Sequence, residues 1–305
     1  MNRKKIELRE ERDFGQKFNA VFTFIQSNFK PFVKVIAFTV GPLAIVGGVF
    51  FGLFFSKFSS LMGLAAGDNP DYFGWFAEIA VSYFFLGAAS LWMTIAVFSY
   101  MAEYEKGNEN ITIEAVWNRG KGKIWPVIGF SLLIIPVMVI VALIIFALPG
   151  NENAGIIILK MLLLYVAIFY VMITLSLVVP NMVIDDAYLF ESIGRGFVLI
   201  QGKWWSTFGL LFVMGTIAYI ATMVFAIPFY AGWIITLILQ TSATGILTII
   251  GACILFLGSF LMMTLPTLAL GFQYFNLVER KEGTGLLKKI DQLGKPVNTA
   301  NESEF

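Results

Sequence analysis

The carboxylates near the middle of the chain are the clearest candidates for chemistry. Asp185 and Asp186 are adjacent, and Glu191 follows them beside Arg195. Paired carboxylates can hold a hard divalent cation. They can also cap the first amide groups of a helix and form a local ion pair. Both interpretations fit the spacing, and the helix cap with an ion pair to Arg195 is the simpler one.

The sequence offers few other residues that could carry out catalysis. The chain has no histidine and one cysteine, Cys253, so the usual general base, the commonest metal ligand and thiolate metal clusters are missing. No Gly-rich phosphate loop of the Walker type is present. We therefore expect a protein that is not an enzyme, with no cofactor and no metal.

Two charged residues lie inside otherwise apolar segments. Glu78 lies one turn from the outer end of its segment, and Lys160 lies near the outer end of another. Charges within a membrane are candidates for function, and the similar depths of these two predict an intramembrane pair. The alternative is that both side chains extend to the outer headgroups.

Aromatic and basic residues form a repeated pattern. Residues 18–31, 113–126 and 193–206 align without a gap: an apolar residue, an aromatic residue four positions later, a polar or small turn, then aromatic and basic residues before a long apolar segment. Such residues anchor proteins at the membrane interface. A sharper hypothesis is a cytoplasmic collar that binds anionic headgroups or a partner helix. The candidate contacts are Phe22, Phe29, Lys30, Trp117, Lys123, Trp125, Arg195, Phe197, Lys203, Trp204 and Trp205.

The elements that must position these residues are membrane helices. The chain is 58% hydrophobic and 13% charged, with a mean hydropathy of +0.80, whereas soluble domains carry about 25% charged residues. Since roughly 20 apolar residues cross a bilayer, the charge-free blocks predict six transmembrane helices. The blocks are 35–56, 79–102, 124–151, 161–184 and 204–278. The expected spans are about 32–55, 74–100, 125–148, 155–180, 206–229 and 246–274.

Residues 10–30 predict an amphipathic helix in the headgroup region. Their apolar positions recur at steps of three and four residues, which makes one stripe. The stripe consists of Phe14, Phe18, Phe22, Ile25 and Phe29. We expect Pro31 to begin the first span and Gly41-Pro42 to kink it. Gly48 and Gly52 then form a GxxxG pattern that permits close helix packing.

The resulting fold class is an all-α integral membrane protein built from three parallel repeats, each an interfacial amphipathic helix followed by a helical hairpin. The repeats cover about 14–101, 109–181 and 185–275. Residues 1–30 form a cytoplasmic segment with the amphipathic helix, 31–275 the membrane domain, and 276–305 a partly disordered cytoplasmic tail. The apolar stretch 231–244 is expected to be an outer interfacial segment.

The basic residues predict the orientation. Of the 21 Lys and Arg residues, all but Lys57 and Lys160 fall on the side that carries the N-terminus. Because basic residues stay on the cytoplasmic side, we expect both termini in the cytoplasm and the protein in the inner membrane of a bacterial cell.

The third copy of the pattern also carries a resemblance. Glu191-Ser-Ile-Gly-Arg195-Gly-Phe197 followed by Gln201-Gly-Lys203-Trp204-Trp205 resembles an element of bacterial polytopic membrane domains, including the membrane domain of glycerophosphodiester phosphodiesterases. The opening Arg12-Asp13-Phe14-Gly15 looks like the start of a related uncharacterised family. In the phosphodiesterases the chemistry belongs to a separate soluble domain, so the resemblance implies no activity for this chain.

Two functions remain open. The first is a non-enzymatic membrane protein that organises lipids or protein partners through the collar. The alternative is a transporter or lipid-translocating protein with a cavity between the hairpins, which polar uncharged side chains would line if they did not bond to helix carbonyls. Those side chains are Ser82, Thr94, Thr174, Thr216, Thr222 and Thr264. The expected partners are membrane lipids, with a protein partner or a second copy of the chain, and not nucleic acid.

Overall fold

The computed structural model describes residues 6–57, 72–108, 110–148, 153–239 and 242–283, together with Gly285. Every element within those ranges is helical, as the composition predicts. The helices are α1 (Phe14–Thr39), α2 (Gly41–Ser56), α4 (Tyr72–Glu105), α5 (Ile113–Gly120), the 3-10 turn η1 (Lys121–Lys123), α6 (Ile124–Phe146), α7 (Ala154–Leu175), α8 (Val178–Ile184), α9 (Leu189–Ile200), α10 (Trp204–Leu239) and α11 (Ser242–Glu282).

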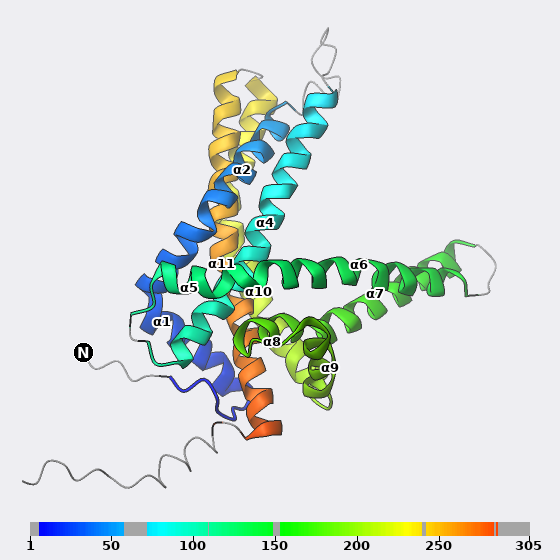
Figure 1. Ribbon diagram of the computed structural model, residues 1–305. Coiled ribbons are helices and arrows are strands. Elements are labelled where there is room, and N and C mark those ends of the chain that lie inside the picture. The colour runs from blue at the N-terminus through cyan, green and yellow to red at the C-terminus, as the bar shows by residue number, and fades with distance from the viewer. Residues whose placement is uncertain are drawn as a thin grey trace, which may run out of the picture.

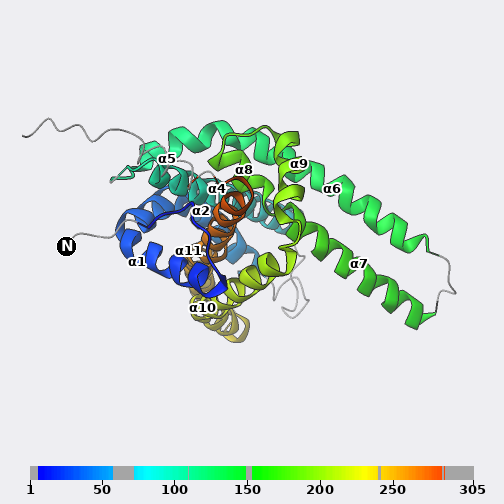
Figure 2. The ribbon, with the colours of Figure 1, turned by 90° about the horizontal axis from the view of Figure 1, so that it is seen from below.

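Helices α2, α4, α10 and α11 run side by side as a bundle (Figure 1). Helix α11 is the central element, and it contacts α1, α2, α4, α8, α9 and α10 (Figure 2). Its last turns are buried among these helices, with Phe272, Tyr274 and Phe275 fully enclosed. Phe24 of α1 packs edge-on against Phe272 and against Tyr104 of α4. This aromatic core joins both ends of the chain to α4.

Glycines allow the bundle helices to pack closely. A Cβ at Gly52 of α2 would lie 2.4 Å from Ile249 Cα of α11, and one at Gly48 would lie 3.0 Å from Cys253 Cα. Only a residue without a side chain fits at such a distance. The predicted GxxxG pattern is therefore confirmed as a close contact between two helices of the same chain.

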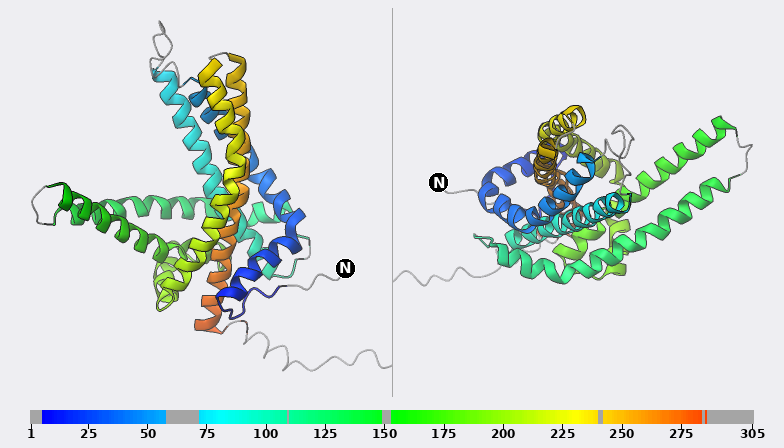
Figure 3. Two further views of the ribbon diagram at one scale, coloured as in Figure 1. Left: turned by 180° about the vertical axis from the view of Figure 1, so that it is seen from behind. Right: turned by 90° about the horizontal axis from the view of Figure 1, so that it is seen from above.

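The hairpin of α6 and α7 leaves the bundle and runs crosswise to it (Figures 1 and 3). Its side chains are apolar around the helix circumference and mostly exposed, including Leu143 at 64%, Ile158 at 67% and Tyr165 at 68%. Helices that are apolar on all sides belong in a core or in hydrocarbon. Since the described residues offer no core around this hairpin, its surface requires lipid or a partner.

Five helical segments are long and apolar enough to cross a membrane within the described ranges, and α1 with α2 forms a bent pair that would make a sixth. These five segments are Tyr72–Glu105, Ile113–Phe146, Ala154–Ile184, Trp204–Leu239 and Gly245–Glu282. The chain thus has the helices of a membrane protein, with five or six candidate spans.

The first span does not begin where the sequence predicts. Helix α1 continues through Pro31, because Phe24 and Phe32 on either side of the proline pack into the same core, which offsets the lost backbone hydrogen bond. The bend of 51° comes instead at Val40, directly before Gly41-Pro42. The predicted kink at Gly41-Pro42 is confirmed, and the predicted helix start at Pro31 is wrong.

The first half of α1 also buries a different face from the predicted stripe. Lys17, Val21 and Phe24 are buried, whereas Phe14 and Phe29 are 43% and 55% exposed. The helix packs against α11 and α4 rather than resting only on lipid. Apolar periodicity predicts which apolar side chains share a face, and it cannot reveal that the interior accepts a lysine.

Two other boundaries differ from the sequence prediction. The predicted interfacial segment 231–244 continues α10 as far as Leu239, and α11 begins at Ser242. A Cβ at Gly232 would lie 2.7 Å from the Leu247 carbonyl carbon, so tight packing of α10 on α11 holds this stretch helical despite Pro228. The predicted span 155–180 falls within the candidate span Ala154–Ile184, in which α7 ends at Leu175 and α8 begins at Val178.

The three copies of the repeated pattern differ in local structure. The second breaks at the 3-10 turn Lys121–Lys123, and the third turns at Gly202, which has a φ of +74°. The first stays helical throughout. The link between the first two predicted spans and the predicted tail 276–305 fall largely outside the described residues.

Candidate functional site

Asp185 is the centre of a polar network on the side of the molecule where α11 ends. One carboxylate oxygen accepts a hydrogen bond from Arg9 Nη2 at 2.7 Å. The other accepts from Arg195 Nη1 at 2.9 Å and from the Tyr274 hydroxyl at 2.7 Å. Both oxygens are therefore engaged, and three of the roughly four lone-pair positions of the carboxylate accept hydrogen bonds.

The partners of Asp185 extend the network to other helices. Arg9 also pairs with Glu105 at the end of α4. Arg195 on α9 also pairs with Glu282 on α11 at 2.8 Å and with the Asn181 side chain at 2.7 Å. Charges that are mostly buried are stable only when they are paired and hydrogen-bonded. This network, which we call the Asp185 cluster, joins the N-terminal segment to α4, α8, α9 and α11.

The charge states follow from this arrangement. Burial by itself raises the pKa of Asp185, but Arg9, Tyr274 and Arg195 outweigh it and hold that pKa below its ordinary value. Burial lowers the pKa of Arg9, and its bonds to Glu105 and Asp185 more than reverse the effect. Both groups are ionised at neutral pH.

Asp186 joins a second set of contacts. It has a positive φ of 58°, a backbone conformation that Asp tolerates better than most residues. Its carboxylate lies 2.7 Å from Lys123 Nζ and 3.3 Å from Arg119 Nη2. Arg119 also donates to the carbonyl oxygens of Val183 and Ile184 at the end of α8. A cation suits the negative end of a helix, so these contacts dock α5 and η1 onto α8.

The structure corrects the predicted roles of the three carboxylates. Asp185 follows the last turn of α8, while the residue preceding α9 is Tyr188, which makes no side-chain cap. The predicted helix cap is therefore wrong, and the predicted ion pair to Arg195 is made by Asp185. Glu191 is exposed on α9. Among the described residues no three acidic or thiol side chains gather as a metal site.

The predicted intramembrane pair is also replaced. Glu78 of α4 forms an ion pair with Lys57, which follows α2. Lys160 of α7 is 4% exposed and donates to the Phe146 carbonyl at 3.2 Å, within its own hairpin. Glu78 lies on α4 in the bundle, and Lys160 lies on α7 in the hairpin that runs crosswise to the bundle (Figure 1). The two residues therefore lie on elements that point in different directions.

The candidate collar residues fall into two groups. Some are exposed: Phe29, Trp117, Trp125, Phe197 and Trp205 at 55%, 47%, 78%, 52% and 76%, together with Lys30. Others make contacts inside the protein. Lys123 and Arg195 are in ion pairs, Trp204 stacks on Tyr170, and Phe22 packs on Phe18. Lys203 lies at the start of α10. The candidate collar residues are thus partly an exposed surface, mainly aromatic, and partly side chains that form ion pairs and ring contacts inside the protein.

Five of the six candidate hydroxyl groups in the spans bond to helix carbonyls. Thr94, Thr174, Thr216 and Thr264 each donate within their own helix. Ser82 of α4 donates to the Gly47 carbonyl of α2 at 2.9 Å. These five groups therefore serve helix geometry and packing, whereas the buried Thr222 Oγ1 of α10 has no hydrogen-bond partner among the described residues.

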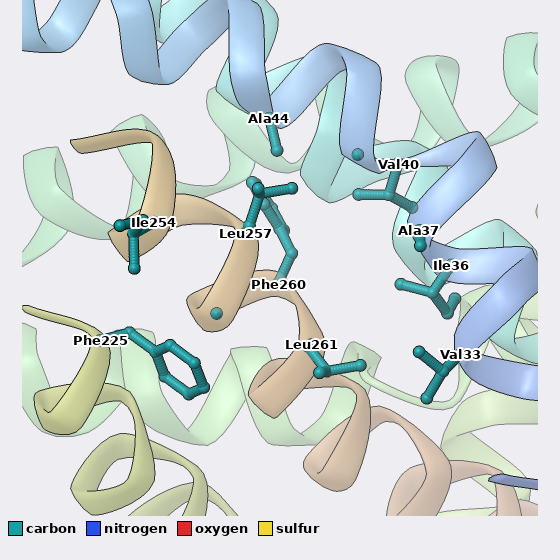
Figure 4. A pocket seen from close by; sticks show the side chains of 12 residues that line it. Val33, Ile36, Ala37, Val40, Ala44, Phe225, Ile254, Leu257, Phe260 and Leu261 are labelled. Carbon is teal, nitrogen blue, oxygen red and sulfur yellow. The ribbon is translucent and has the colours of Figure 1, made fainter. Parts of the chain in front are cut away.

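An apolar groove lies at the bend between α1 and α2 (Figure 4). It has a volume of about 340 Å³, and its walls come from α1, α2, α10 and α11, with Val40, Leu257 and Phe225 among them. Every lining residue is apolar or glycine. Such a groove suits a hydrocarbon chain and offers nothing to a polar solute.

Sequence reasoning missed the main members of the polar network. Arg9, Glu105 and Tyr274 lie in three separate regions of the chain, and no local pattern links them. The usable signal was Asp185 itself, an acidic residue directly after an apolar block. No protein-family model, curated protein or solved structure matches this chain, so the resemblance to phosphodiesterase membrane domains stays a prediction.

Proposed function

We propose that this chain is a non-enzymatic, multi-pass inner-membrane protein that organises lipids or protein partners through its cytoplasmic collar. In this proposal both termini lie in the cytoplasm, and the three copies of the aromatic-basic pattern are repeats of one unit. Six spans cross the bilayer, which requires the α6–α7 hairpin, crosswise to the bundle here (Figure 1), to turn alongside it. The collar is the surface formed by Phe29, Lys30, Trp117, Trp125, Phe197 and Trp205.

The observation that carries this proposal is the Asp185 cluster. In this cluster Asp185, Arg9 and Arg195 pair with one another near the end of α11 and connect helices. Both oxygens of Asp185 accept hydrogen bonds. A catalytic base needs a free lone pair facing a substrate site. A fully paired cluster instead makes a rigid support for α4, α8, α9 and α11 at the end of the molecule that carries the collar residues.

The test measures bound lipid in the full-length chain, purified in a mild detergent. Trp125→Ala combined with Trp205→Ala should reduce the retained anionic phospholipid several-fold, because both side chains are more than three-quarters exposed and aromatic side chains anchor at the headgroup level. The matched control is Phe84→Ala, which removes an aromatic side chain that is 70% exposed in the middle of α4. A solitary wild-type monomer without bound lipid or protein would reject the proposal.

The apolar groove favours one second candidate, a protein that handles or translocates lipid. Its hydrocarbon lining at the α1–α2 bend suits an acyl chain (Figure 4). Reconstituted protein should then speed the movement of a fluorescent phospholipid between leaflets, and Ala44→Phe, which fills the groove, should abolish the effect. Vesicles with and without protein that show equal rates would exclude this function.

A further inference from the structure

Lys17 is a buried cation without a counter-ion. Its residue is 3% exposed, on the first turns of α1. Its ammonium group donates to Gln273 Oε1 at 2.7 Å and to Ser206 Oγ at 3.2 Å. Both acceptors are neutral, and an ammonium group has three protons to donate. Within the described part of the chain, neither Lys17 nor Lys203 forms an ion pair.

A chain of hydrogen bonds between buried side chains holds Lys17 in place. Gln273, which is fully buried, donates in turn to Thr207 Oγ1 at 2.8 Å. The lysine is thus held by a hydrogen-bond chain across α1, α11 and α10. A desolvated cation is costly unless a negative group compensates it, so a fixed and unpaired ammonium group at this position favours an anion.

Lys17 faces a pocket of about 360 Å³ where α1 and α10 begin and α11 ends. Lys203, Arg12 and Arg280 also line it, with Ser206 and Asn276 as neutral polar neighbours. Arg280 and Lys203 repel the Lys17 ammonium group, and Asp13 attracts it without forming an ion pair with it. The amino ends of two helices meet at this pocket and add to its positive potential.

The acidic residues of the pocket are already engaged. Glu11 pairs with Arg280 at 3.1 Å. Asp13 accepts the Gln16 amide at 2.8 Å as the cap of α1. Neither carboxylate neutralises Lys17 or Lys203, so the pocket keeps an excess of positive charge.

We propose that this pocket binds a phosphate group, with Lys17 and Lys203 as its principal ligands. The phosphate belongs to an anionic phospholipid headgroup or to a small soluble phosphate. Next to Lys203, Trp204 and the 76%-exposed Trp205 begin α10, a position typical of the headgroup level. The inference deepens the proposed lipid-organising function and rests on its placement of this end of the chain at the membrane surface.

The test uses the full-length protein in detergent, with native mass spectrometry and thermal unfolding as readouts. The probes are dioleoyl phosphatidic acid, dioleoyl phosphatidylglycerol and inorganic phosphate, each titrated separately. Lys17→Met and Lys203→Gln should each weaken binding about tenfold or more, since each removes a charged hydrogen-bond donor. Met suits the buried position of Lys17, and Lys17→Met should unfold at the wild-type temperature or above it when no ligand is present.

Lys34→Met is the matched control, because Lys34 is exposed on the same helix and the charge change is identical. It should leave binding within about twofold of wild type. Binding of both lipids that inorganic phosphate does not displace identifies a headgroup site. Binding of inorganic phosphate that depends on Lys17 identifies a soluble ligand.

Two results would overturn the inference. One is wild-type affinity in Lys17→Met and Lys203→Gln for every probe. The other is an equal loss in Lys34→Met, which would show a general charge effect. If the lipids then still depend on Trp125 and Trp205, the collar function stands and only the pocket fails. If wild type binds no lipid at all, both proposals fail.

Discussion

Arg9 donates a hydrogen bond to Asp185 at 2.7 Å, although the two residues are 176 positions apart in the chain. Their side chains are 14% and 16% exposed. The contact fastens the segment before α1 to the link between α8 and α9, and it does so beside the end of the central helix α11. The segment before α1, the link after α8 and the last turns of α11 are therefore held by one ion-pair cluster.

Breaking this pair should destabilise the protein. Arg9→Ala leaves Asp185 buried with one fewer partner, and we expect a loss of about 3 kcal/mol in the free energy of unfolding. Thermal unfolding can be followed by reaction of a maleimide dye with the single cysteine, Cys253. The double variant Arg9→Ala and Asp185→Asn should lose less than the sum of the single losses. Strict additivity would argue against a coupled cluster.

The matched control for this prediction is Arg280→Ala. Arg280 pairs with Glu11 at 3.1 Å, with side-chain exposures of 40% and 57%. Exposed ion pairs contribute less than about 1 kcal/mol. A loss as large as that of Arg9→Ala would mean that burial of the ion pair does not determine the size of the effect.

Stability should fall in acid through Asp185. Its pKa is held below the ordinary value in the folded protein, so the folded state binds this proton more weakly than the unfolded state. The contribution is complete above the unfolded pKa of about 3.9 and is lost as the pH falls through the folded pKa. Unfolding followed by tryptophan fluorescence from pH 7 to pH 3 should show this loss below about pH 4. Asp185→Asn should show a shallower decline, and identical slopes would contradict the assignment.

Close packing of α2 on α11 predicts a strong effect at Gly52. The added Cβ of Gly52→Ala would lie 2.4 Å from Ile249 Cα, so the helices must separate, at a cost of about 1–3 kcal/mol. Gly87→Ala in α4 is the control, because a Cβ there meets nothing within 4 Å. It should be neutral or slightly stabilising. Equal melting temperatures for the two variants would show that the α2–α11 contact is not formed.

The α6–α7 hairpin should lie in hydrocarbon. In a Cys253→Ala background, Ile140→Cys and Val166→Cys lie at positions that are 55% and 57% exposed on the hairpin. We expect both to resist a water-soluble maleimide in membranes, since the surrounding surface is apolar. Tyr188→Cys, at a position 84% exposed on the α8–α9 link, should react in everted vesicles and not in intact cells. Rapid labelling of Ile140→Cys would place the hairpin in water.

The sequence by itself determined the helical class, the approximate spans and the close packing at Gly48 and Gly52. These features are local: a charge-free block of sufficient length favours a membrane helix wherever it occurs, and a GxxxG pattern marks a surface that admits another helix. The bend at Gly41-Pro42 follows from the same kind of reasoning.

Only the tertiary structure decided which charges meet. The sequence around Asp185 predicts a helix cap. In the structure, its hydrogen-bond partners come instead from the N-terminal segment, α9 and α11. Lys17 lies outside the predicted apolar stripe of residues 10–30, yet it is buried where three helices converge. The energy of an ionised side chain depends on distance and burial, and helix packing sets both quantities among residues that lie far apart along the chain.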